Sequence, residues 1–502
     1  MSSPTIRLEH LYTDLDASMA KLRQDHSAVN QSRKIVDMAL LDGKAHYGIN
    51  TGLGVLANIR ISKQKLATLQ KNILLSHACG IGVPVPPEIT RLMLQLKIHS
   101  LGLGYSGVSE QTFLQLLTMV ENDILPHVPS RGSVGASGDL APLAHLCLPL
   151  IGRGDVWDAK LRDRLPAGPV LKEKGVKPIN LQPKDGLALI NGTQLMSAYG
   201  AFVLERTLIL QRGADLLAAM SLEALQGSAV PFDARIHDIR PHNGQQLVAS
   251  NIRKLLLGSE ILASHRDCGK VQDPYSLRCV PQVHGASRDA LTYAGNCIET
   301  ELNSVTDNPL VFPQGDILSG GNFHGQPLAL AMDFAAIALA ELGSISERRT
   351  YLLLEGHDGL PKLLMKDTGV NSGFMIPQYT AAALVSENKI LCHPASVDSI
   401  PTSLGQEDHV SMGAISAFKL LSVLLNVERV LAVELLTSAQ ALDFRKPHAP
   451  GRGVALAHDA LRSTIKHAVK DYELRNDLDR CAAMLRDGSL LHAVESELGP
   501  LQ

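Results

Sequence analysis

The sequence predicts an all-α protein, in which a bundle of long helices follows a mixed, loop-rich amino-terminal region. Aromatic residues make up only 4% of the 502 residues, whereas Leu and Ala are abundant. This balance favours packed helices over a β-sandwich, whose strands are rich in aromatic and β-branched residues. Within residues 420–436, apolar side chains cover most of the circumference of a helix, which is typical of a helix inside a bundle. Several such stretches with short connections predict an extended antiparallel bundle.

The pattern along the chain predicts three segments. Residues 1–192 alternate short helical patterns with glycine-rich turns, and within them residues 151–186 predict little helix because Gly, Pro and Lys punctuate this stretch. Residues 193–447 predict the long-helix bundle. The sequence HAPGRG, which begins at residue 448, breaks the helical pattern, so we expect residues 448–502 to form a separate carboxy-terminal helical segment.

Charge and hydropathy argue against nucleic-acid and membrane partners. The net charge of -3 and the pI near 6.7 provide no basic field for nucleic acid or anionic lipid. The apolar segments 327–342 and 410–436 are interrupted by charged residues and do not offer the about 18 uninterrupted apolar residues of a membrane span. They predict buried helices instead. The first residues, MSSPTIRLEH, lack the apolar stretch of a signal peptide.

The cysteines indicate a reducing compartment. There are 7 of them, an odd number, and they are widely scattered without a Cys-x-x-Cys pair. This pattern is typical of reduced thiols rather than of a disulfide framework or a zinc site. We therefore expect a cytoplasmic location and no metal site.

The most informative segment is GSVGASGDLAPLAH, residues 132–145. Taken alone, it fits a purely structural role, since Asp139 can serve as a helix N-cap and Pro142 is tolerated in a first helical turn. A phosphate-binding loop is disfavoured, because no Gly-Lys-Ser/Thr ending follows the glycines. A nucleophile elbow needs Gly-x-Ser-x-Gly, whereas Ser137 is followed directly by Gly138.

The same residues permit a backbone cyclisation. If the amide nitrogen of Gly138 attacks the carbonyl carbon of Ala136, a five-membered ring closes, and glycine helps because it has no Cβ and adopts strained dihedrals. Loss of water from the ring and then of the Ser137 hydroxyl leaves an exocyclic methylidene on an imidazolone. That group is a strong electrophile, which ordinary side chains cannot supply. The sequence permits this chemistry but does not by itself show that it happens.

In this setting, Ala136-Ser137-Gly138 resembles the precursor of the methylidene-imidazolone (MIO) group of the aromatic amino acid ammonia-lyases. Further blocks between residues 47 and 413 resemble that family in the family's order. These blocks are YGINTG (47–52), LLSHACGIG (74–82), LINGTQ (189–194), QDPYSLRCVPQVHG (272–285), TDNPLVF (306–312), SGGNFHG (319–325) and QEDHVSMG (406–413). Coincidence does not explain so many blocks in the same order.

The resemblance implies an all-helical fold of the fumarase/aspartase type and a homotetramer whose active sites combine several subunits. It implies an MIO group that forms autocatalytically from Ala136, Ser137 and Gly138, so that no dissociable cofactor is needed. The implied reaction is the elimination of ammonia from an aromatic amino acid. This reaction needs an electrophile, a base for the proton on the β-carbon and a clamp for the substrate carboxylate.

By the resemblance, Tyr47 in YGINTG is the catalytic base. A tyrosine with an ordinary pKa of about 10 must be made more acidic by its surroundings to act near neutral pH. Asn191 in LINGT is implied to hydrogen-bond the substrate or the electrophile, and Phe323 in GGNFHG is implied to lie beside the electrophile. Without the family, Tyr47 could be a packing residue, Asn191 part of a turn and Phe323 a core aromatic.

Tyr275 and Arg278 are three residues apart, so they share a face of a helix or of a single turn. The resemblance implies that Arg278 pairs with the substrate carboxylate, a task that suits its planar bidentate fork. It places Tyr275 near the reacting centre and makes Gln272 a further polar residue of the lining. An arginine without this context is usually a solvated surface group.

Substrate choice depends on His77 and Glu407. The Ser-His pair in SHACG resembles the members that act on histidine, whereas those that act on phenylalanine usually carry apolar residues there. Glu407 can accept a hydrogen bond from an imidazole N–H, and a buried polar pair left unsatisfied by an apolar ring costs about 1–3 kcal/mol. A structural ion pair is the simpler interpretation of Glu407. His324 and His409 are expected to be structural.

We therefore expect conversion of L-histidine to trans-urocanate and ammonia, the first step of histidine degradation. A lyase or 2,3-aminomutase that acts on tyrosine or phenylalanine is the alternative within the same family. A catalytically silent helical scaffold is the alternative from another class. The intact Ala136-Ser137-Gly138 tripeptide, together with Tyr47 and Arg278, argues against such a scaffold.

Overall fold

The computed structural model describes residues 5–266 and 269–502, so Cys268 lies outside the described residues. Helix accounts for 61% of the structure and strand for 5%, which confirms the predicted all-α class. The chain divides into two compact units. Unit 1 comprises Met1–Phe202, Gly295–Asp333 and Pro394–Phe418, and unit 2 comprises Val203–Ala294, Phe334–His393 and Lys419–Gln502. The predicted segment boundaries after residues 192 and 447 stay a prediction.

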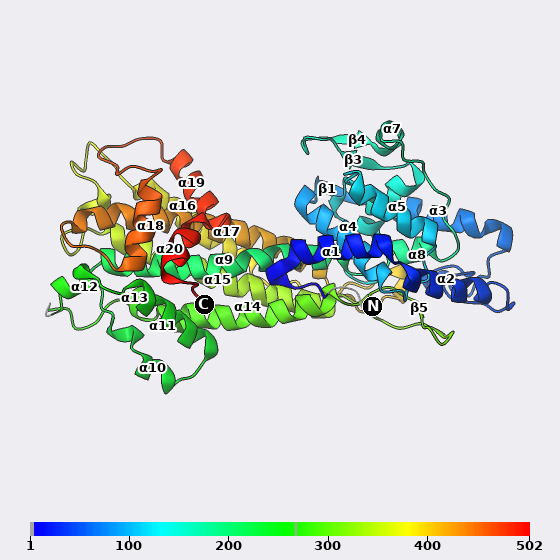
Figure 1. Cartoon of the computed structure of the whole chain (residues 1–502), viewed down its shortest axis with the longest axis horizontal. Helices are drawn as coiled ribbons and strands as arrows, with labels where there is room; N and C mark the ends of the chain where they lie inside the picture. The colour runs from blue at the N-terminus through cyan, green and yellow to red at the C-terminus, as the bar shows by residue number, and fades with distance from the viewer. Residues whose placement is uncertain (1–4, 267–268) are drawn as a thin grey trace. The chain divides into compact units, whose positions relative to one another are not determined.

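Unit 1 packs short and medium helices around an apolar core (Figure 1). Its helices are α1 (Leu11–Gln24), α2 (Ser27–Ala39), α3 (Leu66–His77), α4 (Pro87–Gly102), α5 (Glu110–Glu121), α6 (Leu140–Cys147), α7 (Ala167–Glu173) and α8 (Asp185–Ile190), with the 3-10 turns η1 (Leu8–His10), η2 (Gly54–Leu56), η3 (Lys63–Lys65), η4 (Leu148–Ile151) and η7 (Ser403–Gly405). Every residue of α4 from 92 to 102 is buried, because apolar side chains surround the helix and α1 and α5 pack against it.

Three two-stranded antiparallel sheets complete unit 1. They are β1 (Ile81–Pro84) with β2 (Pro129–Arg131), β3 (Asp155–Trp157) with β4 (Arg164–Pro166), and β5 (Leu310–Val311) with β6 (Ile317–Leu318). Ile81 lies opposite Arg131 at the end of β2, so the β1–β2 pairing fixes where the loop of residues 132–139 begins. Residues 151–186 contain the β3–β4 hairpin and the 7-residue α7, which confirms that this stretch has little helix.

Four long helices contribute residues to both units. They are α9 (Gln194–Ala224), α14 (Val280–Leu302), α15 (Gln326–Leu354) and α17 (Gly413–Leu442). α15 and α17 contain the apolar stretches that were predicted to be buried helices, and most of their side chains are buried. Among the described residues, α15 alone is long and apolar enough to cross a membrane, and 67% of its most apolar window is buried inside the protein, as in the core helix of a globular fold.

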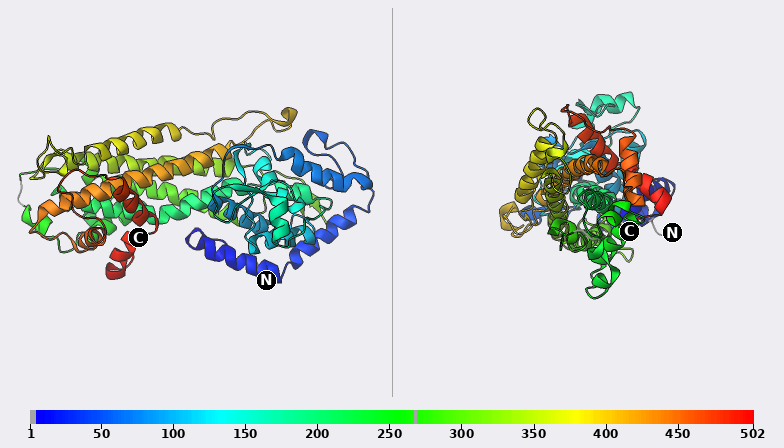
Figure 2. Two further views of the ribbon diagram at one scale, coloured as in Figure 1. Left: turned by 90° about the horizontal axis from the view of Figure 1, so that it is seen from above. Right: turned by 90° about the vertical axis from the view of Figure 1, so that its left-hand side faces the viewer.

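Unit 2 groups the long helices with shorter ones, as the end-on view in Figure 2 shows. Its own elements are α10 (Ala234–Asp238), α11 (Asn243–Leu255), α12 (Glu260–Ser264), α13 (Tyr275–Arg278), α16 (Met375–Leu391), α18 (Arg452–Arg462), α19 (Arg475–Arg486) and α20 (Ser489–Leu498), with η5 (Val230–Phe232), η6 (Lys362–Leu364) and η8 (Asp443–Arg445). No helix covers the residues between η8 and α18, which confirms the predicted break at HAPGRG.

Candidate active site

The loop of residues 132–139 connects β2 to α6 and is held by contacts on both of its sides. The Ser133 hydroxyl donates to Asp139 Oδ1 (2.9 Å) and accepts from the amide of Gly135 (3.1 Å). The segment before α17 closes over the other side, where the amide of Met412 donates to the Val134 carbonyl (2.8 Å). Ala136 is buried in a cluster with Val410 and Met412. The predicted ring-forming tripeptide is therefore anchored before and after Ser137.

Asp139 occupies the N-cap position of α6, as predicted, but its side chain makes no capping bond there. Its carboxylate accepts hydrogen bonds from the amides of Leu195 (3.0 Å) and Met196 (3.1 Å) in the first turn of α9. It thus caps a different helix from the one expected, because that helix begins directly beside the loop. Burial raises the pKa of Asp139 to about 7, although these amides and the Ser133 hydroxyl oppose the shift.

Gly138 is in close contact with the turn that follows α8. Its φ is +72°, in the left-handed region, and a Cβ placed on it would lie 2.1 Å from the carbonyl oxygen of Gly192. The next amide, that of Asp139, donates to the same Gly192 oxygen (2.7 Å). Only glycine fits both the backbone conformation and the space at this position.

A cavity of about 1150 Å³ within unit 1 opens onto this loop. Predicted site residues from six separate parts of the chain line it. They are Tyr47, His77, Ala136, Ser137, Asn191, Phe323 and Glu407. The structure therefore brings together most of the residues that the sequence comparison with the family singled out.

Two side chains contact Ser137 directly. The Ser137 hydroxyl donates to Glu407 Oε1 (2.5 Å), and Glu407 Oε2 accepts from the hydroxyl of Thr402 (2.5 Å). The Asn191 side-chain amide donates to the Ser137 carbonyl oxygen (2.7 Å). The Asn191 Oδ1 is buried and has no hydrogen-bond partner in the described part of the chain, so it can accept from a molecule in the cavity.

Tyr47 and His77 lie on other walls of the cavity. The Tyr47 oxygen accepts a hydrogen bond from the amide of Gly54 (3.2 Å), so this contact does not use the hydroxyl proton of Tyr47. His77 is the last residue of α3, and its Nδ1 lies 2.8 Å from the carbonyl oxygen of Ile73. Because a carbonyl only accepts, Nδ1 carries the proton in this contact and Nε2 of a neutral ring is left as an acceptor.

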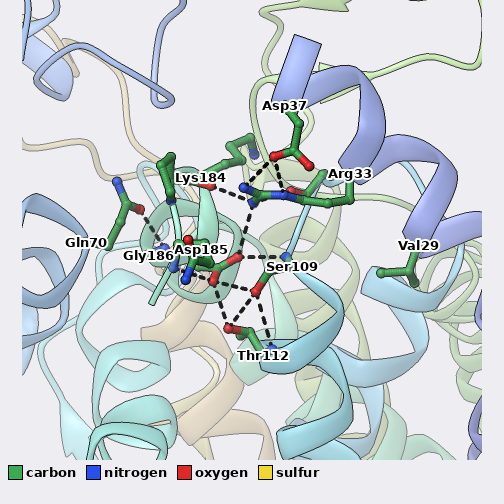
Figure 3. Close-up of polar contacts among 12 residues, drawn as sticks. Val29, Arg33, Asp37, Gln70, Ser109, Thr112, Lys184, Asp185 and Gly186 are labelled. Atoms are coloured by element: carbon green, nitrogen blue, oxygen red, sulfur yellow. Dashed lines mark hydrogen bonds and ion pairs between the residues drawn. The ribbon is translucent and has the colours of Figure 1, made fainter. Parts of the chain in front are cut away.

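Asn191 is positioned by the buried start of α8. The Asp185 carboxylate accepts from the amide (2.7 Å) and hydroxyl (2.7 Å) of Ser109 and from the hydroxyl of Thr112 (2.8 Å), as Figure 3 shows. The amide of Gly186 donates to Gln70 Oε1 (2.8 Å). These contacts tie α8 to α5 and α3, and Asn191 follows its last residue.

The remaining predicted residues, Gln272, Tyr275 and Arg278, belong to unit 2 and do not line this cavity. Tyr275 and Arg278 begin and end the four-residue α13, and the Arg278 guanidinium carbon lies 4.7 Å from the centre of the Tyr275 ring. They share a face, as their spacing predicted. Tyr275 is 70% exposed, and Gln272 lines a separate cavity of about 480 Å³.

Sequence reasoning missed some residues near the tripeptide. His324 and His409, which we expected to be structural, line the cavity with their rings stacked 5.9 Å apart. Thr402 holds Glu407, but a lone threonine gives no signal in a sequence. Lys97 is a charged residue within the apolar helix α4 and is only 1% exposed. A lysine inside such an apolar stretch is a signal that sequence reasoning could have used.

Comparisons with known proteins agree with this geometry. The family model described as aromatic amino acid lyase matches residues 10–463. The chain is 52% identical over 471 residues to the histidine ammonia-lyase of Anaeromyxobacter sp. (strain K), a match that covers 92% of this chain and 93% of that protein. The crystal structure of histidine ammonia-lyase from Trypanosoma cruzi matches with a TM-score of 0.88 and 42% identity, over 95% of this chain and 90% of that one.

A tyrosine aminomutase from Streptomyces globisporus is also similar, with a TM-score of 0.90 and 35% identity over 100% of this chain and 99% of that one. The same helical architecture is therefore compatible with more than one outcome for an aromatic amino acid. The family follows from its model, which covers most of the residues, and from relatives that are similar over nearly the whole chain. This chain belongs to the aromatic amino acid lyase family.

Proposed function

We propose that this protein eliminates ammonia from L-histidine to give trans-urocanate, using an MIO group formed from Ala136, Ser137 and Gly138. The observation that carries the proposal is the contact of Ser137 with both Glu407 and Asn191 in one cavity that His77 and Tyr47 also line. Two of the relatives reported above are named for action on histidine. Their similarity over more than nine-tenths of this chain supports the same substrate here.

The tripeptide fits the formation of this group. A bond forms between Gly138 N and Ala136 C, and the Ala136 oxygen leaves as water with the amide protons of Gly138 and Ser137. A second water takes the Ser137 hydroxyl and the proton on its Cα, which leaves the methylidene. Gly138 has the side-chain-free, left-handed backbone that such a closure needs, and Asn191 already holds the Ser137 carbonyl oxygen. When formed, the MIO group supplies an electrophilic carbon that side chains lack.

Glu407 and His77 are the residues that we propose to select the substrate. Loss of the Ser137 hydroxyl removes one partner of Glu407, so its Oε1 becomes free while Oε2 stays with Thr402. A carboxylate oxygen freed in this way can accept an imidazole N–H from histidine. The His77 Nε2 can accept a second hydrogen bond. A phenyl ring satisfies neither acceptor, and each buried acceptor left unpaired costs about 1–3 kcal/mol.

Tyr47 is the proposed base for the proton on the substrate β-carbon, since it lines the same cavity as the tripeptide and its hydroxyl proton is not used in the contact with Gly54. Asn191 is proposed to orient the substrate or the ring through its amide, and Phe323, which also lines the cavity, is proposed to lie beside the ring. Arg278 is proposed to bind the substrate carboxylate with its bidentate fork, with Tyr275 and Gln272 beside it.

These last three residues motivate the proposal of a homotetramer with shared active sites. They belong to unit 2 and are absent from the cavity of unit 1, and Tyr275 is mostly exposed. In a homotetramer, another subunit can supply them to this cavity. We also propose a cytoplasmic location, which is supported by the reduced state of the six described cysteines, Cys79, Cys147, Cys279, Cys297, Cys392 and Cys481.

Intact-mass measurement and product analysis test the proposal together. The purified chain should be lighter than its sequence by two water molecules, and the change Ser137→Ala should restore that mass and remove most activity. Incubation with L-histidine should yield urocanate. Cinnamate or coumarate without urocanate would reject the substrate, and a β-amino acid would instead indicate an aminomutase. An open tripeptide in fully active protein contradicts the proposed mechanism.

Co-expression of two inactive variants tests the shared site. Chains with Ser137→Ala retain Arg278, and chains with Arg278→Ala retain the tripeptide. If Arg278 acts in a site of another subunit, mixed tetramers should regain part of the activity that each variant lacks alone. Light scattering should give the mass of four chains. Absence of any recovery in verified mixed tetramers contradicts the shared site, without bearing on the mass test of the tripeptide.

A further inference from the structure

Lys97 is a fully buried cation that the proposed reaction leaves without a role. It lies in α4 and is 1% exposed. The structure shows no carboxylate within ion-pair distance of it in residues 5–266 and 269–502. Its Nζ donates instead to the backbone carbonyl oxygen of Asn191 (2.7 Å) and lies 3.5 Å from Gln194 Oε1. A buried ammonium that is not paired with an anion lowers stability, so its placement calls for a local function.

The groups around Lys97 do not compensate for the burial of its charge. Burial lowers the pKa of Lys97 to about 8. The ionisable groups that face it are Asp307, Cys147, Lys184 and Asp139. Asp307 is already paired with Lys184 (3.2 Å) and accepts from Ser106. The one short contact of the Lys97 ammonium is therefore with a neutral carbonyl.

That carbonyl belongs to the turn that contacts the tripeptide twice. On one side, the Asn191 side chain donates to the Ser137 carbonyl oxygen (2.7 Å). On the other, the Gly192 oxygen accepts the amide of Asp139 (2.7 Å). The nitrogen of Gly138, which must attack Ala136, lies in the chain between these two anchors. Lys97 donates to the backbone of the same turn, so one turn joins its ammonium to both anchors.

We propose that Lys97 is a positioning residue for maturation of the tripeptide: its ammonium fixes the Asn191–Gly192 turn so that Ser137 and Asp139 are held while Gly138 N closes onto Ala136. The inference rests on the proposed function, since it concerns formation of the same group. A displacement of the turn by a fraction of an ångström misaligns the attacking nitrogen, and ring closure depends steeply on such alignment. The charge strengthens the contact, because hydrogen bonds from charged donors are stronger than neutral ones.

Three substitutions separate the hydrogen bond from mere packing. Lys97→Met keeps the length of the side chain but removes the donor, Lys97→Gln keeps a neutral donor, and Lys97→Arg keeps a charged one. The readout is the fraction of chains that lack two waters, measured by intact mass at fixed times after synthesis. Loss of one charge-assisted hydrogen bond should slow maturation in Lys97→Met by about tenfold to a hundredfold. Lys97→Gln and Lys97→Arg should restore part of it.

Lys184→Met is the matched control. Lys184 is equally buried and is paired with Asp307, and its side-chain contact is with that carboxylate rather than with the Asn191–Gly192 turn. Its replacement should lower the thermal midpoint and leave the rate of maturation unchanged. If folded Lys97→Met matures at the wild-type rate, or if Lys184→Met slows maturation equally, the inference is wrong. If Lys97→Met does not fold, a folded Lys97→Gln that matures as fast as the wild type and Lys184→Met overturns it instead, because a neutral donor should restore only part of the rate.

The same mass measurement distinguishes this inference from the proposed function. Wild-type protein of unreduced mass in an active preparation contradicts the MIO proposal and with it the role of Lys97. Wild-type protein that lacks two waters, together with an unaffected Lys97→Met, contradicts only the role of Lys97. In mature chains of Lys97→Met, kcat should fall more than KM rises, because Asn191 is displaced relative to the ring rather than removed from the cavity.

Discussion

Both units bury ionisable side chains, but the buried charges beside the tripeptide and those within the helix bundle have different hydrogen-bond partners. In unit 1, the carboxylates of Asp139 and Asp185 are met chiefly by backbone amides and hydroxyls, and the ammonium of Lys97 by a carbonyl. In unit 2, Glu434 forms a two-pronged ion pair with Arg349, and Asp215 accepts from His284 (2.8 Å). Neutral partners therefore surround Asp139 and Lys97 beside the tripeptide, whereas basic side chains face Glu434 and Asp215 within the helix bundle. The buried Lys184–Asp307 pair is an exception in unit 1.

This difference distinguishes ionisable groups that serve the chemistry of the tripeptide from ionisable groups that join the long helices. Neutral donors do not offset burial fully, so the pKa of Asp139 rises to about 7 and that of Asp185 also rises. Perturbed groups of this kind gather at functional sites. Ion pairs in unit 2 join α9 to α14 and α15 to α17, and we assign them to the orientation of these helices. Variants of the groups that contact the tripeptide or the Asn191–Gly192 turn should thus impair maturation, and variants of the unit 2 ion pairs should impair stability.

Gly138→Ala should have the largest effect and should act on chemistry. The new Cβ would lie 2.1 Å from the Gly192 oxygen on a backbone with φ of +72°, so the tripeptide must shift. We expect no loss of two waters and a fall in turnover of more than about a hundredfold. Gly175→Ala is the matched control, because Gly175 has φ of +71° with no atom within 4 Å of the added Cβ. A mature, active Gly138→Ala protein would contradict the assigned crowding.

Arg349→Met should have the next largest effect and should act on stability. Both Arg349 and Glu434 are fully buried, with guanidinium–carboxylate contacts of 2.5 and 2.9 Å. Removing one partner of a buried pair costs about 3–5 kcal/mol, and replacing both by apolar residues restores much of it. Denaturant midpoints should therefore fall in Arg349→Met and recover in the double change with Glu434→Leu. Turnover per mature site should stay unchanged. If Arg349→Met also slowed maturation of the tripeptide, the buried charges of the two units would no longer differ in their effects.

Asp443→Asn should have a smaller effect, also within unit 2. Burial opposes ionisation of Asp443, but His458 (3.2 Å), Arg462 (2.8 Å) and His467 (2.8 Å) outweigh it and hold its pKa well below the ordinary value. The stability from a lowered pKa is present above the unfolded value of 3.8 and is lost as pH falls below it. We expect a loss of about 2 kcal/mol near neutral pH that disappears in acid. A loss of equal size at both pH values would assign it to packing.

The sequence predicted the helical class, and most of the site residues that it singled out line one cavity. Long apolar periodicity and local motifs can be recognised in the sequence without coordinates. Three features needed coordinates. The Asp139 side chain caps α9 rather than the helix it begins, since the two helix starts meet only in the folded chain. Glu407 reaches Ser137 across 270 positions. The backing of the Asn191–Gly192 turn by Lys97 joins two segments with no shared motif. Arg278 was singled out by its motif, but it belongs to unit 2 and does not line the cavity, so its role stays a prediction.

Asp139→Asn should have the smallest effect and should show the opposite pH dependence from Asp443→Asn. A pKa raised from 3.8 to about 7 means that the folded chain binds the proton more tightly than the unfolded one. The stability from this group is therefore fully present below about pH 4 and is lost as pH rises through about 7. Asn cannot ionise, so the variant should lack that part of the decline. Denaturant midpoints between pH 4 and 8, measured in a Ser137→Ala background to keep the tripeptide open in both chains, should fall less steeply for Asp139→Asn. Equal pH slopes of the denaturant midpoint in the two chains would show that Asp139 is ionised throughout this range. The neutral partners of Asp139 would then have no electrostatic effect that distinguishes it from the ion-paired carboxylates of unit 2.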